Sequence, residues 1–347
     1  MLNSRSPVLA LCLSTALIAC GPGALVEGAT APPRERGNAV DISSEQLEVG
    51  SRLASLRGQN LVSVELYKRH QSAEALLAVA RSREYARSLQ LSVDGEAQAG
   101  FTTLSSAIDA ATTRLRRGGV SGAPIEALAT AGKATLQIES ELVGVTSRLA
   151  AYKATIVISL VNEAAILYES AVEGPFDHED YRAAYGSLRE AKNIHDGLAT
   201  VLEENTNDEA RAADILLAAI FGAMPSSDPP IRLLPPDEVS AAAYILGVFL
   251  ADNYGAVPTP SRSLTPPLFY IFPLLEEVLG SYESGEAGVA DVLLEKVRAS
   301  LCCPSTSAGD ALEIELARLS KAIRSGAADL DIATLVERSS ELAADAT

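Results

Sequence analysis

Beyond residue 42, apolar residues recur at spacings of three and four along nearly the whole chain, which is the period of one face of an α-helix. No stretch shows the sustained alternation of apolar and polar residues that predicts a β-strand. The pattern therefore predicts an all-α protein, with helices over residues 43–69, 72–91, 94–117, 124–172, 178–203, 207–223, 237–254, 267–283, 287–301, 308–325 and 329–344.

Two segments are apolar on nearly all sides, Thr155–Tyr168 and Val239–Ala251. Both are shorter than the roughly 20 apolar residues that a membrane-spanning helix needs. The first also contains Asn162 and Glu163. We therefore expect both to be central helices of a protein core, buried on several faces.

A faint internal repeat is centred on Tyr67, Tyr168 and Tyr282, each of which closes a predicted helix that is followed by a turn and an amphipathic helix. Such hairpins build antiparallel bundles or solenoids. The repeat length is about 100 residues, against about 34 in tetratricopeptide solenoids, which favours bundles. We expect antiparallel bundles of about ten helices, in halves 43–204 and 205–347 or as one continuous domain.

The N-terminus has a different pattern. Arg5 precedes the apolar run Val8–Ala19, which is too short to span a bilayer and is typical of a signal peptide over residues 1–19. The run ends in Leu17-Ile18-Ala19-Cys20, which resembles the lipobox of bacterial lipoproteins. That resemblance implies cleavage between Ala19 and Cys20 and attachment of acyl chains such as palmitate at Cys20. The alternative is an ordinary secretory signal that happens to end beside a cysteine.

Residues 20–42 contain glycines and prolines but few large apolar side chains, and this composition is typical of a flexible tether. Two or more acyl chains would hold such a tether stably in a membrane. Gly21 stands where lipoproteins retained in the inner membrane of enteric bacteria carry aspartate. We therefore expect a lipid-anchored envelope protein, in the outer membrane and facing the periplasm.

Charge and composition narrow the possible partners. The chain has 45 acidic and 28 basic residues and a formal net charge of −17. This balance argues against nucleic acid as a partner and against a basic membrane-binding surface. The hydrophobic fraction of 48% is enough for a folded core. The expected partners are the membrane, through the N-terminal lipid, and another envelope protein.

Motifs of catalysis and cofactor binding are missing from the sequence. It has no Gly-x-Ser-x-Gly or Ser-x-x-Lys motif, no phosphate-binding glycine loop and no Cys-x-x-Cys-His. We therefore predict no catalytic residues, no cofactor and no enzymatic activity. An enzyme without a recognisable motif remains an alternative.

Metal binding is considered because acidic helical bundles can present carboxylates and imidazoles from facing helices. The candidate ligands are Glu169, Glu173, His178 and Asp180. The competing interpretation, which we favour, is that the acids around His178 cap the start of a helix. If the helix is continuous, His195 lies about 25 Å along it from His178, so these two histidines cannot share an ion.

Two adjacent cysteines, Cys302 and Cys303, remain in the folded part if the signal peptide is removed and Cys20 is lipidated. They could form a vicinal disulfide, stay as buried thiols, bind a soft metal with other donors, or pair between molecules. Thiol–disulfide catalysts normally separate their cysteines by two residues, which argues against redox catalysis.

Val161–His195 resembles the helical extracytoplasmic segment that precedes the permease in some iron transporters of the FTR1 type. The likeness consists of a helix that contains Tyr168 and ends near Ala171-Val172, a short turn, and a second helix that starts near Tyr181. The resemblance implies a periplasmic module near metal uptake. The Arg-Glu-x-x-Glu motif and the membrane helices of those permeases are missing from this chain.

Taken together, the sequence favours a lipid-anchored helical protein of the cell envelope that acts as a non-enzymatic binding or scaffolding module. The alternative is an accessory protein that handles a metal, iron in particular, for an uptake system.

Overall fold

The computed structural model describes residues 43–92, 97–118, 122–143, 149–203, 207–256, 272–300 and 307–345. All of these residues belong to one compact unit. Within these ranges the chain forms helices and no strand, which confirms the predicted all-α class. The helices are α1 (Ser44–Lys68), α2 (Ser72–Ser92), α3 (Gln98–Arg117), α4 (Ala123–Val143), α5 (Leu149–Val172), α6 (His178–Glu203), α7 (Asn207–Ala223), α8 (Pro236–Tyr254), α9 (Phe272–Glu283), α10 (Ala287–Ser300), α11 (Ser307–Arg324) and α12 (Asp329–Asp345).

Most helix boundaries fall close to their predicted positions, and α6 and α7 match them at both ends. The single long helix predicted over 124–172 is wrong, because α4 and α5 are separate helices with different neighbours. α4 packs on α1 and α3, whereas α5 packs on α6, α8 and α1. A straight helix of that length would extend over roughly 70 Å and could not pack on both sets of neighbouring helices.

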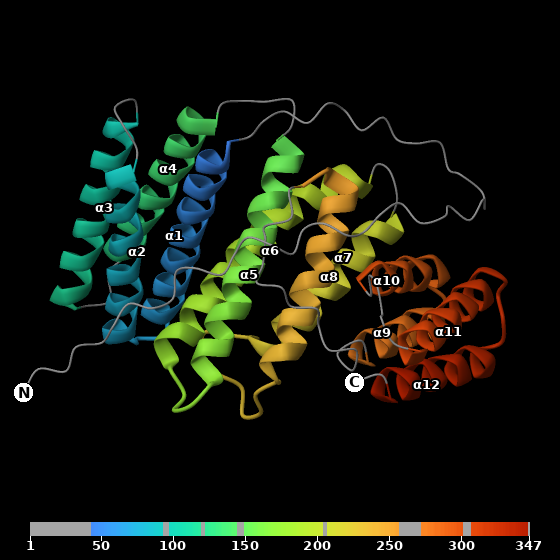
Figure 1. The fold of residues 1–347 in the computed structure, drawn as a ribbon. Helices are drawn as coiled ribbons and strands as arrows, with labels where there is room; N and C mark the ends of the chain where they lie inside the picture. Colours follow the sequence, from blue (N-terminus) through green and yellow to red (C-terminus); the bar gives the residue numbers. More distant parts are fainter. Residues whose placement is uncertain are drawn as a thin grey trace, which may run out of the picture. The chain divides into compact units, whose positions relative to one another are not determined.

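The helices pack as three consecutive groups of four, and in each group neighbouring helices pack on one another and the fourth helix packs on the first. Figure 1 shows the first group, α1–α4, in blue to green. The second group is α5–α8 and the third is α9–α12. The predicted hairpin-built bundles are thus confirmed. The expected division after residue 204 falls between α6 and α7, two helices of one group.

The three tyrosines of the faint sequence repeat lie near the ends of α1, α5 and α9, the first helix of each group. The Tyr168 hydroxyl donates to the carbonyl of Leu234, at 2.9 Å, and the Tyr282 hydroxyl donates to the carbonyl of Ala327, at 2.6 Å. Leu234 and Ala327 both lie just before the fourth helix of their group. The second and third groups therefore each contain the same kind of hydrogen bond, which links the end of the first helix to the residues just before the fourth.

The turns after α1 and α9 also match. His70 and Gly285 are the third residues after Tyr67 and Tyr282, and both have positive φ, at 63° and 82°. In each turn the following residue donates its backbone N–H to a carbonyl one residue before the tyrosine, at 2.9 Å in both. The sequence repeat is therefore the visible part of a repeated four-helix unit.

The core runs through all three groups, and the middle of α1 is fully enclosed in it. All eight residues from Leu53 to Asn60 are buried, because α1 packs on α2 and α4 of its own group and on α5 and α6 of the next. α5 is the one described helix long and apolar enough to cross a membrane, and α5 and α8 are both buried on several faces, as predicted.

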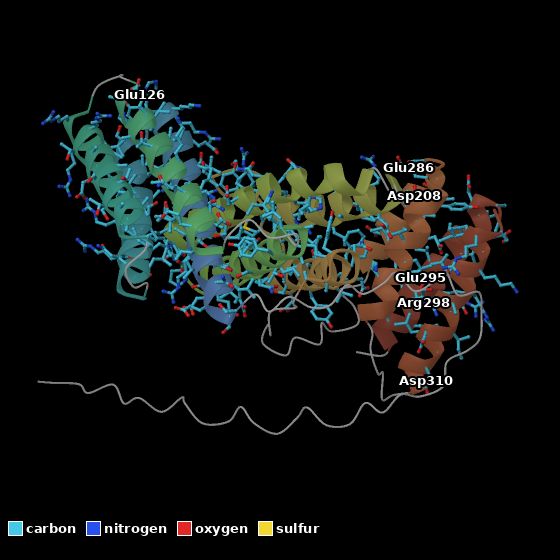
Figure 2. The ribbon with its side chains drawn as sticks, turned by 90° about the horizontal axis from the view of Figure 1, so that it is seen from above. Glu126, Asp208, Glu286, Glu295, Arg298 and Asp310 are labelled. Carbon is cyan, nitrogen blue, oxygen red and sulfur yellow. The ribbon has the colours of Figure 1, made fainter. Side chains whose placement is uncertain are left out.

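The second and third groups meet where α10 packs on α7 and α8. Figure 2 labels Asp208 on α7 and Glu286 just before α10 near each other. Arg211 Nε lies 3.5 Å from a carboxylate oxygen of Glu286. A Cβ atom at Gly288 would lie 2.0 Å from the exposed Asp208 carboxylate, so a larger residue there would require the Asp208 side chain to rotate away.

Candidate functional site

The interface between the first two groups is built around a close approach of α1 and α6. A Cβ atom at Gly58 would lie 2.3 Å from the backbone oxygen of Gly186, and one at Gly186 would lie 3.0 Å from the Gly58 backbone. Two glycines facing each other therefore let the helix backbones nearly touch. Buried and half-buried polar side chains lie near this point, and we call them the polar seam: Ser55, Arg57, Gln59, Tyr85, Glu139, Tyr152, Glu163, Ser187 and Glu190.

Arg57 is the only cation of the seam. Its Nε donates to Glu190 on α6 at 2.5 Å, and its Nη1 donates to Glu139 on α4 at 2.6 Å. The Tyr152 hydroxyl donates to the second oxygen of Glu139 at 2.9 Å. The guanidinium thus connects three helices, one of which belongs to the neighbouring group.

Burial alone would lower the pKa of Arg57, but Glu139 and Glu190 outweigh this effect and raise the pKa above its ordinary value. Burial, reinforced by Glu139, also raises the pKa of Tyr152. The tyrosine stays a neutral hydrogen-bond donor while the arginine stays charged. Both side chains therefore keep these protonation states around neutral pH.

Glu163 on α5 forms the other half of the seam. Its carboxylate accepts hydrogen bonds from the hydroxyls of Ser55 on α1, Tyr85 on α2 at 2.7 Å and Ser187 on α6 at 3.3 Å. Burial, followed by the nearby Glu163, raises the pKa of Tyr85, which keeps this hydroxyl protonated. Three hydroxyl donors thus satisfy a carboxylate in the central apolar helix.

The polar seam fixes the register of α1 against α5 and α6, because its hydrogen bonds form in one alignment only. Sequence reasoning missed Arg57, Glu139 and Glu190, since charged residues on a helix usually face solvent. The available signal was Arg57 itself, which lies between Leu53, Leu56 and Val62 on a helix with few other charges nearby.

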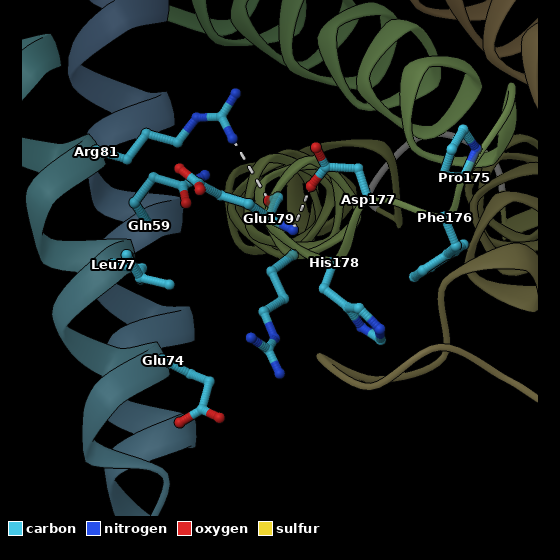
Figure 3. A pocket seen from close by; sticks show the side chains of 11 residues that line it. Gln59, Glu74, Leu77, Arg81, Pro175, Phe176, Asp177, His178 and Glu179 are labelled. Carbon is cyan, nitrogen blue, oxygen red and sulfur yellow. Dashed lines mark hydrogen bonds between the residues drawn. The ribbon is translucent and has the colours of Figure 1, made fainter.

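A cavity of about 460 Å³ lies between α2 and the start of α6. Figure 3 shows Glu74 and Leu77 on one wall, Phe176 on the opposite wall and His178 between them. Leu77 is 51% exposed although it is a large apolar residue. The cavity therefore combines an accessible apolar surface with polar walls.

Three charged side chains around this cavity, Arg81, Arg182 and Asp177, are held by neighbours. Arg81 donates to an Asp180 carboxylate oxygen at 3.0 Å and to the backbone oxygen of Glu179 at 3.4 Å. Arg182 donates to the backbone oxygen of Ser227 at 3.4 Å. Asp177 accepts from the backbone N–H groups of Glu179 and Asp180, at 2.7 and 3.2 Å. These contacts fix the positions of both arginines, and Asp177 caps the start of α6.

The candidate metal ligands from the sequence lie around the turn between α5 and α6. Asp180 is engaged by Arg81 and by the Ser170 hydroxyl, which donates at 2.9 Å. The His178 ring makes an edge contact with Phe176, with the ring centres 4.8 Å apart. Glu173 is exposed and Glu169 is half-buried. These four residues are not among the described carboxylate and imidazole groups close enough to share an ion.

His195 lies near the other end of α6, which is continuous from His178 to Glu203, so the expected separation of the two histidines holds. The His195 side chain is 0% exposed. Its Nδ1 lies 3.9 Å from Oδ1 of Asp214 on α7. Burial lowers the pKa of His195 below its ordinary value, against the opposing effects of Asp214 and Asp196. The imidazole is therefore neutral at pH 7.

The predicted processing and cysteine sites, Ala19, Cys20, Cys302 and Cys303, lie outside the described residues. Comparison of the whole chain with known protein families, characterised proteins and solved structures finds no match.

Proposed function

We propose that this chain is a lipid-anchored, non-enzymatic binding module of the cell envelope, held at the outer membrane through Cys20. The lipobox-like tetrad before Cys20 supports the anchor, and residues 20–42 would serve as the tether to the helical body. The polar seam supports the scaffolding part of the proposal, because it aligns the first two helix groups as a rigid support.

The cavity between α2 and α6 is the observation that carries the binding role. Its walls stand on long helices, and its two arginines, Arg81 and Arg182, are already held by neighbours, so they need little further ordering on binding. Leu77 offers an exposed apolar contact, and the Phe176 ring lies across from it. The partner that fits is another protein presenting an apolar side chain flanked by polar groups.

A photocrosslinking amino acid at Leu77 tests this role in intact cells. We expect one discrete adduct with another envelope protein, because the probe would lie in the interface. The matched control is the same probe at Leu136 on α4, which is similarly exposed at 57% but lies outside the cavity. No adduct at Leu77, or the same adducts from both positions, would contradict the proposal.

A further inference from the structure

A second feature of α6 lies well away from the cavity. His195 is fully buried, and neither ring nitrogen has a hydrogen-bond partner among the described residues. A buried imidazole normally satisfies at least one of its nitrogens, because an unpaired buried polar group costs about 1–3 kcal/mol. Among the described residues, the buried His195 ring is therefore left without the hydrogen-bond partner that a buried polar group needs.

Two carboxylates lie close to the His195 ring, so that one ligand could contact the imidazole and both carboxylates. One ligand atom each of His195, Asp196 and Asp214 can be chosen so that all three lie within 4.8 Å of one another. For three atoms this close together there is always a point no more than about 2.8 Å from each of them, compared with metal–ligand bonds of about 2.0–2.2 Å. Both carboxylates are exposed, so rotation of their side chains can close this difference.

We propose that His195, Asp196 and Asp214 bind a divalent first-row transition-metal ion such as Zn²⁺. One imidazole with two carboxylates suits these ions, whereas Ca²⁺ takes oxygen ligands throughout and Cu⁺ prefers sulfur. The neutral imidazole is the form that coordinates metals. This site shares no residue with the proposed binding cavity, so either proposal can fail without the other.

A groove beside these residues would give an ion access to the site, and a lysine in it competes for one of the carboxylates. A groove of about 510 Å³ between α6 and α7 is lined by Asp196 and Asp214 among others, and it leads to the carboxylates from outside. Lys192 lines the same groove, and its Nζ lies 2.8 Å from Oδ1 of Asp196. A metal ion bound through that oxygen would displace the lysine, so the lysine weakens binding.

Calorimetric titration of the full chain with Zn²⁺, after purification with a chelator, tests the site. We expect one binding event that weakens at least about tenfold in His195→Gln and in Asp214→Asn, since each removes a ligand. Lys192→Gln should bind at least as tightly as wild type. His178→Gln is the matched histidine control and should leave this event unchanged.

Thermal melting gives a second measurement, because a ligand that binds only the native state raises the melting temperature. Zn²⁺ should raise it in wild type and His178→Gln, with the rise lost in His195→Gln and Asp214→Asn. Asp214 is 47% exposed, so its variant remains informative if the buried His195 variant does not fold. Unchanged binding in Asp214→Asn, or loss of the event in His178→Gln alone, would overturn the proposal.

Discussion

Replacing Arg57 by methionine should lower the free energy of unfolding by about 3–5 kcal/mol, because it leaves the buried Glu190 and the half-buried Glu139 without their cation. Methionine keeps much of the volume and the unbranched shape of arginine, so the loss reports charge rather than a cavity. Glu139 and Glu190, bonded to the guanidinium at 2.6 and 2.5 Å, would then face an apolar side chain. Urea denaturation measured by circular dichroism gives the change.

Two comparisons make the Arg57 result specific. Arg52→Met on the same helix removes a half-buried cation that pairs with Glu48 and donates to the Ser88 hydroxyl on α2, and it should cost no more than about 1–2 kcal/mol. Adding Glu139→Gln and Glu190→Gln to Arg57→Met removes the stranded charges and should restore part of the stability. Equal effects of Arg57→Met and Arg52→Met would show that the buried cluster does not hold the helices together.

The second large effect is expected at the crossing of α1 and α6. Gly58→Ala places a methyl group 2.3 Å from the Gly186 backbone oxygen, and no rotamer change can relieve a clash with backbone. Forcing the helices apart should destabilise the fold by about 1–3 kcal/mol or more, measured by the same denaturation. The separation would also strain the hydrogen bonds of the polar seam.

Gly132→Ala is the matched glycine control, because no described atom beyond its own helix and chain neighbours lies within 4 Å of a Cβ atom there. Alanine is the better helix former, so this variant should gain about 0.5–1 kcal/mol. Opposite signs for two identical substitutions would locate the effect in the helix crossing. Destabilisation of the same size at both positions would contradict the tight α1–α6 approach.

Periodicity was sufficient to predict the helical class, most helix ends and the hairpins, because apolar spacing and turn residues act locally. The division of 124–172 into α4 and α5 was missed because the apolar pattern continues across the break, while the two helices pack on different neighbours. The repeat at Tyr67, Tyr168 and Tyr282 was visible, but its four-helix period depends on long-range packing that spacing cannot give.

The sites were harder to predict than the fold. In the sequence, His195 was considered only for its distance from His178. The local sequence does not predict that Asp214, on the next helix, comes within 3.9 Å of the His195 ring. The Arg57 cluster joins residues from α1, α4 and α6, and only packing reveals such a contact. Asp180 was considered as a ligand from its neighbours in sequence, whereas the structure pairs it with Arg81 from α2.

Labelling cells with a palmitate precursor tests the lipid anchor, the central claim of the proposed function. Wild-type protein should incorporate the label and remain with the membrane fraction, because under this proposal acyl chains on Cys20 would hold it there. Cys20→Ala should lose both the label and the membrane association while keeping its helical content. A Cys20→Ala protein that is still labelled and still retained in the membrane would contradict the account.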